Sequence, residues 1–250
     1  MIPDENVGPR VAAQQEAPML TVDALDASYN AISALRQVSL RVDAGEAVAV
    51  LGSNGAGKST LLKSISGAMD NTSGSIVFNG SHISGRSPIR ICQSGISHVP
   101  EGRRCFPGLT VRENLLAAAA PGSMRSANRR LSEVLDFFPV VRDRVDALAT
   151  DLSGGQQQLV VIARGLMPQP KLLMVDEASL GLSPIAVQEV AAQLGAVREE
   201  TGLALLLVDQ GLGLPLALCS RGYILRQGSI VAEGAISAIV ERTRTAYLGS

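Results

Sequence analysis

The sequence predicts an α/β fold in which helices cover a mostly parallel β-sheet. Apolar, strand-like runs alternate with helix-like segments along most of the 250 residues, the pattern expected of such a fold. Residues 203–208 are continuously apolar, as expected of a parallel strand that is buried on both faces. Residues 47–51 form another apolar run, which leads directly into a glycine-rich turn and a helix-compatible segment.

The composition excludes several functional classes. With 22 basic and 23 acidic residues the net charge is −1, and no local run of Lys or Arg indicates nucleic-acid binding. The cysteines at positions 92, 105 and 219 lack C-x-x-C spacing, so we expect reduced thiols in a cytoplasmic protein. No apolar stretch reaches the roughly 20 residues of a membrane-spanning helix, so any membrane role requires a partner.

Residues 1–18 form a polar leader. They include prolines and charged residues and have no apolar stretch of the kind that signal peptides carry. We expect them to be disordered, because they offer too little apolar surface to pack. The folded domain is therefore predicted to begin at residue 19.

The N-terminal part of the domain is predicted to contain short strands. Residues 20–25 and 38–42 alternate apolar with polar side chains, and residues 43–46 then turn the chain into the first apolar run. Two further strands are expected at 75–78 and 96–99.

A block of helices is predicted in the middle of the chain, from residue 110 to about 148. Thr110 is a plausible N-cap with Glu113 three residues later, which is a capping box. A second helix is expected at 128–138, and Pro139 should stop it. Its apolar face consists of Leu131, Val134, Leu135 and Phe138.

The C-terminal part returns to alternating strands and helices. An apolar strand at 172–175 precedes a helix at about 184–200, whose N-cap should be Ser183. Two short strands are expected within 221–233, and a last helix at about 235–247.

A phosphate-binding loop follows the strand at 47–51. The pattern G-x-x-x-x-G-K-[ST] stands between a strand and a helix, which is the setting it requires and which disfavours the alternative, a flexible Gly/Ser loop. Its glycines let backbone amides turn toward a polyphosphate, Lys58 can reach the β- and γ-phosphates, and the Ser59 hydroxyl can ligate Mg²⁺. The predicted nucleotide contacts are Gly52, Asn54, Gly55, Ala56, Gly57, Lys58, Ser59 and Thr60.

Three further side chains suit a nucleotide site. Asp176 and Glu177 end an apolar strand, where ligands bind in open α/β sheets. Asp176 can hold Mg²⁺, directly or through water, while Glu177 can activate the attacking water; a solvated acidic turn is the alternative. Tyr29 precedes the phosphate-binding strand and can stack on adenine, although a packed surface tyrosine is the other interpretation.

A second anion-binding turn lies at 152–156. Ser153 can cap the next helix, and Gly154 and Gly155 allow an oxyanion close to free amides before Gln156. Because the chain already has one phosphate-binding loop, we expect this second turn to serve a nucleotide held by another subunit. The alternative is a loop with a good N-cap.

Along the chain these motifs follow in the order Tyr29, 52–59, 152–156 and 172–177. In this order they resemble the aromatic loop, Walker A, signature and Walker B of the ATP-binding subunits of ABC transporters, and the resemblance covers residues 20–250. The resemblance implies a P-loop NTPase fold with a RecA-like core at 19–100 and 153–250, a mostly parallel sheet, and N-terminal antiparallel strands. It also implies an inserted α-helical subdomain at about 101–152. In the implied head-to-tail dimer, each ATP lies between one subunit's phosphate-binding loop and the other's signature turn, and the loop at 179–184 crosses the interface.

Two positions depart from the general ABC pattern. Glu101 stands where a glutamine usually links Mg²⁺ and the attacking water to the helical subdomain, so we expect it near the metal. Its charge requires an offset from Mg²⁺, Arg103 or Arg104. Gln210 stands where a histidine usually contacts the γ-phosphate, and it can donate a hydrogen bond but carries no charge.

With these two substitutions and the segments 105–111, 179–182 and 246–249, the chain resembles the LivF-type subunits of high-affinity branched-chain amino-acid importers. Within that group, Ala178 departs from the usual Pro, and the segment 209–211 is Asp-Gln-Gly where Glu-Gln-Asn is usual. The resemblance implies a peripheral protein on the cytoplasmic face of the bacterial inner membrane. Its partners would be a LivG-like ATPase or a second copy, two transmembrane permeases and, indirectly, a periplasmic binding protein.

Three functional hypotheses follow. The first is an ATPase motor subunit of a branched-chain amino-acid importer, which Glu177 favours. The second is a regulatory or slow-turnover subunit of a heterodimeric importer for urea, amides or other small polar solutes, which Gln210 favours. A soluble ABC protein of translation or DNA repair fits poorly, because the sequence has neither two cassettes nor a long coiled-coil insertion.

Overall fold

The computed structural model describes residues 17–248, with side chains up to residue 243. The prediction for the leader therefore lies, except for its last two residues, outside the described part. In that part no helix combines the length and the apolar character needed to cross a membrane.

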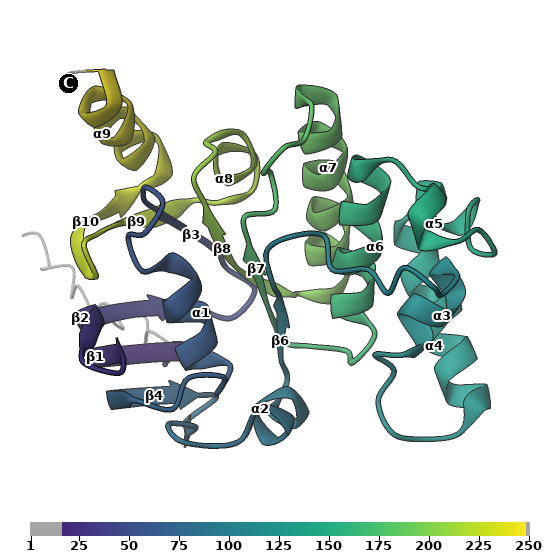
Figure 1. Cartoon of the computed structure of the whole chain (residues 1–250), viewed down its shortest axis with the longest axis horizontal. Helices are drawn as coiled ribbons and strands as arrows, with labels where there is room; N and C mark the ends of the chain where they lie inside the picture. The colour runs from purple at the N-terminus through teal and green to yellow at the C-terminus, as the bar shows by residue number, and fades with distance from the viewer. Residues whose placement is uncertain (1–16, 249–250) are drawn as a thin grey trace, which may run out of the picture.

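The described chain folds around two β-sheets (Figure 1). The smaller sheet is antiparallel and comes from the N-terminal part, as predicted. Its strands in spatial order are β2 (Ile32–Val42), β1 (Leu20–Tyr29), β4 (Thr72–Phe78) and β5 (Ser81–His82).

The larger sheet is mostly parallel, which confirms the predicted fold class. Only its edge strand β10 runs antiparallel to its neighbour. The spatial order is β10 (Ser229–Ala235), β9 (Arg221–Arg226), β3 (Ala47–Leu51), β8 (Ala204–Asp209), β7 (Leu172–Asp176) and β6 (Ile96–Val99).

The central strands are apolar throughout because both faces of the larger sheet are covered. Side chains alternate between faces along a strand. Val48 and Val50 of β3 pack into a core with α1 (Lys58–Ile65) and the antiparallel sheet. Ala47 and Leu51 face the opposite core, which is formed with α6 and α7. Strand β3 is therefore held on both sides at the point where the phosphate-binding loop leaves it.

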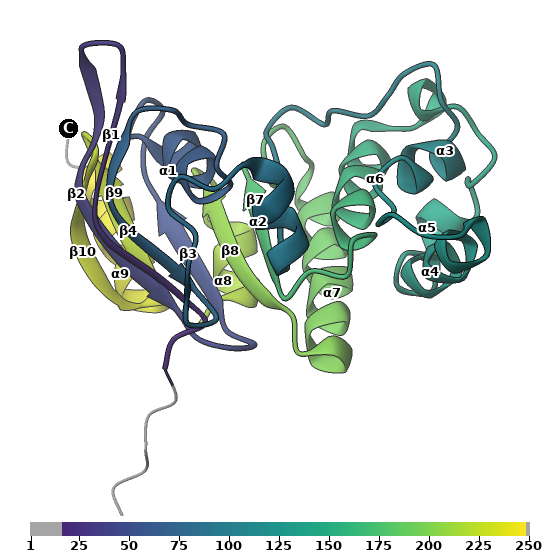
Figure 2. The same ribbon diagram turned by 90° about the horizontal axis from the view of Figure 1, so that it is seen from below.

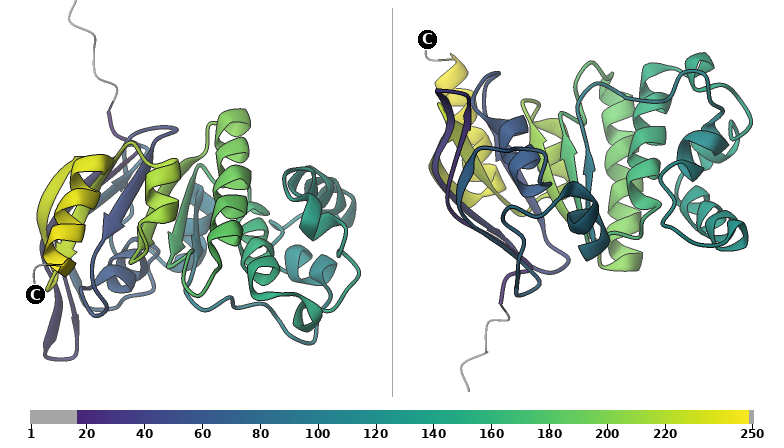
Figure 3. Two further views of the ribbon diagram at one scale, coloured as in Figure 1. Left: turned by 90° about the horizontal axis from the view of Figure 1, so that it is seen from above. Right: turned by 60° about the horizontal axis from the view of Figure 1, so that its bottom comes forward.

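Some of the remaining helices cover the larger sheet, and others lie beyond it to one side. Helices α3 to α5 lie at the end of the molecule remote from the β1–β2 hairpin (Figure 2), and α9 lies at the opposite end, beside β10 (Figure 3). The helices after α1 are α2 (Pro88–Ser94), α3 (Val111–Leu116), α4 (Met124–Phe137), α5 (Pro139–Arg142), α6 (Gly154–Leu166), α7 (Pro184–Thr201), α8 (Gly213–Leu218) and α9 (Ile236–Leu248), with a 3₁₀ turn at Ala149–Asp151.

The helix ends largely follow the predicted caps. Thr110 and Glu113 form the expected capping box at the start of α3, and Ser183 caps α7. Helix α4 begins earlier than predicted, because Ser123 caps it ahead of a polar first turn. Pro139 ends α4 as expected but also opens α5, since proline is well tolerated in a first helical turn.

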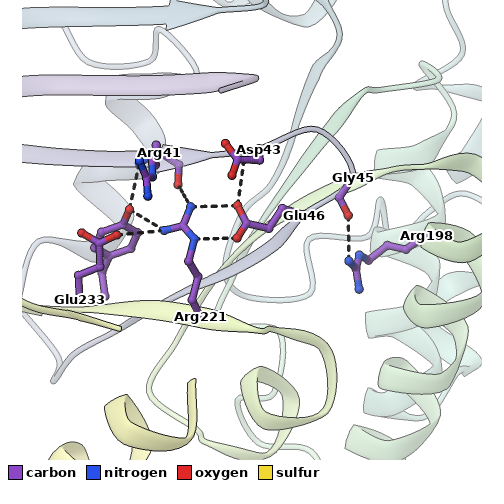
Figure 4. A network of polar contacts seen from close by, with 8 residues as sticks. Arg41, Asp43, Gly45, Glu46, Arg198, Arg221 and Glu233 are labelled. Atoms are coloured by element: carbon purple, nitrogen blue, oxygen red, sulfur yellow. Dashed lines mark hydrogen bonds and ion pairs between the residues drawn. The ribbon is translucent and has the colours of Figure 1, made fainter. Parts of the chain in front are cut away.

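A polar cluster joins the two sheets (Figure 4). The guanidinium of Arg221 on β9 pairs with both carboxylate oxygens of Glu46, at 2.7 and 2.9 Å. The same group donates to the main-chain oxygen of Arg41 on β2 at 2.7 Å. Arg198 of α7 donates to the main-chain oxygen of Gly45 at 2.9 Å. The turn before β3 is thus fixed to both sheets and to a covering helix.

Candidate nucleotide-binding site

The phosphate-binding loop requires glycine at several positions. Gly55 and Gly57 have φ angles of 77° and 106°, in the left-handed region that side chains disfavour. A Cβ atom at Gly52 would lie 2.4 Å from the main-chain oxygen of Leu225, and one at Gly57 would lie 2.7 Å from that of Ala34. The loop is therefore packed against β2 and β9, and its shape is specified by the sequence.

A cavity of about 780 Å³ opens over this loop. Most of the predicted site residues line it, so the fold brings these positions together. They are Tyr29, Asn54, Gly55, Gly57, Lys58, Ser59, Thr60, Glu101 and Glu177. Tyr29 is 44% exposed, so its ring is accessible for stacking.

The cavity also contains residues that the sequence did not indicate. They are Ser33, Ala34, Arg36, Leu180, Gln227 and Gly228. The Gly228 amide donates to the Ala56 carbonyl at 2.9 Å, and the Gly228 carbonyl accepts from the Arg36 amide at 2.7 Å. The sequence predicted two short strands within 221–233, but no local signal placed the turn between them against the phosphate-binding loop.

Lys58 is buried at the floor of the site. Its ammonium lies 2.9 Å from Glu177 Oε1 and donates to the main-chain oxygens of Gly52 and Ser53, at 2.8 and 3.1 Å. Lys58 and Glu177 are 5% and 8% exposed, so this is a buried ion pair. The cation of the loop and the predicted water-activating carboxylate therefore belong to one charge cluster.

Asp176 has the properties of a metal ligand. It is 3% exposed, and its Oδ1 atom is buried without a hydrogen-bond partner in the described part of the chain. Burial raises the pKa of this carboxyl group, and the charge of Glu177 adds to the rise, while a hydrogen bond with Ser59 opposes it. A buried carboxylate oxygen without a donor is unusual and suits coordination of a cation.

The donor set fits Mg²⁺ bound together with phosphates. Among residues 17–243, no group of three or more His, Cys, Asp or Glu could hold a metal alone. Mg²⁺ in nucleotide sites typically takes one or two carboxylates and completes its shell with phosphate and water. Ser59 and Glu101 line the cavity, and Asp176 forms a hydrogen bond with Ser59 from the end of β7, so these three residues offer oxygen donors of this kind.

The expected offset of the Glu101 charge by a neighbouring arginine is not a direct ion pair. Within the described residues neither Arg103 nor Arg104 pairs with the Glu101 carboxylate; Arg104 donates to its main-chain oxygen at 3.0 Å. Arg103 instead donates to the main-chain oxygens of Leu180 and Gly181, at 3.1 and 2.7 Å. Of the three positive charges expected to offset the Glu101 carboxylate, Mg²⁺ remains.

The second anion-binding turn is well formed but contributes no residue to the lining of this cavity. Ser153 Oγ accepts from the Gln156 amide at 3.3 Å, and Gln156 Oε1 accepts from the Ser153 amide at 2.9 Å, a reciprocal capping box. The first amides of α6 have no intrahelical acceptor, and the helix dipole favours an anion there. None of residues 153–156 lines the cavity over the phosphate-binding loop.

Gln210 lies beside Glu177. Its main-chain amide donates to Glu177 Oε2 at 3.1 Å, and its side chain is exposed. Both carboxylate oxygens of Glu177 are therefore engaged, one by Lys58 and one by the segment after β8.

Comparison with known proteins agrees with this geometry. A family model described as ABC transporter matches residues 35–180. The high-affinity branched-chain amino acid transport ATP-binding protein BraG of Pseudomonas aeruginosa is 40% identical over 233 residues, covering 92% of this chain and 100% of BraG. The lipopolysaccharide export ATP-binding protein LptB of Escherichia coli K12 is 33% identical over 235 residues, covering 92% and 97%.

A further relative and a solved structure extend the match. The probable branched-chain amino acid transport ATP-binding protein LivF of Archaeoglobus fulgidus is 32% identical over 226 residues, covering 90% of this chain and 96% of that protein. The ADP conformation of the ABC transporter cassette MJ1267 aligns with a TM-score of 0.82 and 25% identity, covering 94% of this chain and 100% of that one. The chain therefore belongs to the ABC transporter family as an ATP-binding subunit, and it is an ATPase.

Proposed function

We propose that this chain is the ATP-hydrolysing motor subunit of a bacterial importer for branched-chain amino acids. One observation carries the mechanism: Lys58 of the phosphate-binding loop and Glu177 at the end of β7 lie 2.9 Å apart on the floor of one cavity. The identity to BraG, whose name states branched-chain amino acid transport, supports the choice of solute.

Each residue of the cavity has its own role in the proposed ATP hydrolysis. Tyr29 stacks on the adenine ring, and the amides of residues 52–60 surround the phosphates. Lys58 leaves Glu177 for the β- and γ-phosphates when ATP binds, which frees that carboxylate to orient and deprotonate the attacking water. Gln210 donates a hydrogen bond to the γ-phosphate.

Three oxygen donors are proposed to hold Mg²⁺. The Ser59 hydroxyl and Asp176 would bind it from the loop and from β7, and Glu101 would approach from the other side of the cavity. The ion would neutralise charge that develops on the phosphate oxygens. The unpartnered Oδ1 atom of Asp176 is the observation that supports this assignment.

The signature turn at Ser153–Gln156 serves the ATP of a second subunit in our proposal. The absence of residues 153–156 from the lining of the chain's own cavity supports this, as does the exposed apolar side chain of Ile185, which is 78% exposed. The second subunit is a LivG-like ATPase or another copy of this chain. The pair would bind two transmembrane permeases at the cytoplasmic face of the inner membrane, with a periplasmic binding protein delivering the solute.

The function is tested by trapping the assembly and identifying the solute. A Glu177→Gln chain should retain ATP, so purification from host membranes in Mg²⁺–ATP should recover two polytopic permeases. Deletion of the gene should abolish uptake of labelled leucine, isoleucine and valine, and restoring the wild-type gene should recover it. Loss of urea, amide or aromatic-acid uptake alone would change the solute, and recovery of lipopolysaccharide-export components would contradict the importer.

A regulatory subunit with slow turnover is a second candidate, favoured by the uncharged Gln210. The two candidates differ in a reconstituted dimer that carries Glu177→Gln in this subunit only. A motor subunit loses its share of ATP hydrolysis in a single-turnover assay. Unchanged hydrolysis would support the regulatory candidate.

A further inference from the structure

Asp209, at the end of β8, is a buried carboxylate that the proposed chemistry does not use. It is 1% exposed and accepts three hydrogen bonds. The Ser179 amide donates at 3.1 Å, the Ser179 hydroxyl at 2.9 Å and the Gly211 amide at 2.8 Å. No cation pairs with it among the described residues, so its charge is held by uncharged donors alone.

Gly211 is required for this arrangement. A Cβ atom there would lie 2.4 Å from Ser179 Oγ and 3.3 Å from Asp209 Oδ1. Any larger residue would push the Ser179 hydroxyl away from the carboxylate. The two departures at positions 209 and 211 therefore belong to one contact, which we name the Asp209 clamp and define as Ser179, Asp209 and Gly211.

The Asp209 clamp joins the two chain segments that position Glu177. One is the segment after β7, which contains Glu177 and Ser179, and the other is the segment after β8, residues 209–211. Gln210 lies between the two clamped residues of its own segment, and its amide donates to Glu177 Oε2 at 3.1 Å. Ser179 is two residues after Glu177, which has a left-handed φ of 50°. That conformation is uncommon for a residue with a side chain and persists where surrounding contacts fix it.

The clamp has an energetic cost. Burial, with a contribution from the charge of Glu177, raises the pKa of Asp209 to about 6. A buried charge without a cation destabilises a fold unless its hydrogen bonds compensate. A neutral side chain would fill the position at lower cost, which argues for a role beyond stability.

We propose that Asp209 is a positioning residue for ATP hydrolysis. By holding Ser179 and Gly211 it aims the Gln210 amide at Glu177 and keeps that carboxylate turned toward the γ-phosphate. The inference rests on the proposed role of Glu177 as the residue that activates water. Asp209 does not line the cavity over the phosphate-binding loop, so it acts through Glu177.

The test is a double-mutant cycle in the assembled dimer, with ATP affinity, KM and kcat measured for each variant. Asp209→Asn keeps the size of the side chain but replaces one acceptor by a donor. It should lower kcat about tenfold or more while the Kd for ATP changes less than about twofold. Asp146→Asn, on an exposed carboxylate, is the matched control and should change neither.

The cycle separates positioning from a merely structural role. In a Glu177→Gln background, Asp209→Asn should cause no further loss of the residual hydrolysis, because its effect passes through Glu177. Unchanged kcat in Asp209→Asn, or losses that multiply in the double variant, would overturn the inference. If Asp209→Asn does not fold, Ser179→Ala tests the inference in its place, because it removes only the 2.9 Å contact between the Ser179 hydroxyl and Asp209. Ser179→Ala should lower kcat about threefold in the wild type and should cause no further loss in the Glu177→Gln background.

The same measurements separate this inference from the proposed function. Full hydrolysis in Glu177→Gln alone would refute the motor function and the inference with it. A loss in Glu177→Gln combined with full activity in both Asp209→Asn and Ser179→Ala would refute only the role of Asp209.

Discussion

Lys58 illustrates how a single side chain joins stability to function. Its charge is buried and is balanced by Glu177 and by two main-chain oxygens of the loop. The sequence predicted that this lysine faces the phosphates, because the motif G-x-x-x-x-G-K-[ST] places a lysine at this point of the loop. It did not predict the pairing with Glu177, since the two residues are distant in sequence and meet only in the folded sheet.

Lys58→Ala should abolish ATP binding or turnover, because it removes the charge that is placed for the β- and γ-phosphates. It should also lower the free energy of unfolding by about 3 kcal/mol, since Glu177 is left buried without its cation. Lys171→Ala, on an exposed lysine, is the control for titration calorimetry and thermal unfolding. Unchanged ATP affinity and rate in Lys58→Ala would contradict the assignment.

His98 should make the protein less stable in mild acid. Burial, with a contribution from the charge of Lys63, lowers its pKa to about 4, so between pH 6.5 and 4 the unfolded chain binds a proton that the folded chain does not. The free energy of unfolding therefore falls as the pH is lowered through this range, by up to about 3 kcal/mol from this residue. His98→Leu should remove that contribution in urea titrations at several pH values.

Comparing His98→Leu with the wild type isolates the contribution of His98 to the pH dependence of stability. Asp209, with its pKa raised to about 6, contributes in the opposite direction over part of the same range, but equally in both proteins. His82→Leu, on an exposed histidine of β5, is the matched control for replacing a histidine by leucine. An unchanged pH dependence in His98→Leu would contradict the assignment.

At the scale of elements, prediction succeeded where a local signal was strong. The apolar strands and the caps at Thr110, Ser153 and Ser183 were all found from neighbouring residues. Helices α2 and α8 were missed because each has only one or two turns and α8 contains Gly213 and Pro215, which disfavour a helix. For α6 the Ser153 cap was predicted, but the reciprocal contact from the Gln156 side chain was not.

The two capping boxes of α3 and α6 permit a matched test. Ser153→Ala and Thr110→Ala each remove a side-chain cap and should each lower the free energy of unfolding by about 1 kcal/mol. Only Ser153→Ala should also lower ATP hydrolysis by the dimer, because only that turn is proposed to meet a phosphate. Equal effects of both variants on hydrolysis would indicate that the α6 cap is structural alone.

At the scale of the whole molecule, long-range pairing determines the site. Strand β3 lies between β8 and β9, so the loop after β3 meets the β9–β10 turn and the residues after β7 and β8. The sequence predicted the strands but not their order, because hydrogen-bond partners in a parallel sheet are far apart along the chain. The Arg221–Glu46 pair, which ties the turn before β3 to β9, was not predicted for the same reason.

The contribution of that pair can be measured. Arg221→Met alone should lower the free energy of unfolding by about 3 kcal/mol, because it leaves the largely buried Glu46 without its counter-charge. Glu46→Gln alone should cost less, because Arg221 keeps Glu233 as an ion partner at 3.5 Å. The double variant should be more stable than the sum of the single effects predicts. Additive losses in chemical denaturation would show that the two side chains act independently.

The central claim is that one surface of the chain binds ATP while a second, separate surface completes the site of a companion subunit. The most direct measurement is a structure of the Glu177→Gln chain in its dimer, trapped with ATP and Mg²⁺. The account predicts Lys58 of one subunit and Ser153–Gln156 of the other on opposite sides of the same γ-phosphate. A trapped complex in which Ser153–Gln156 face solvent, away from any phosphate, would contradict it.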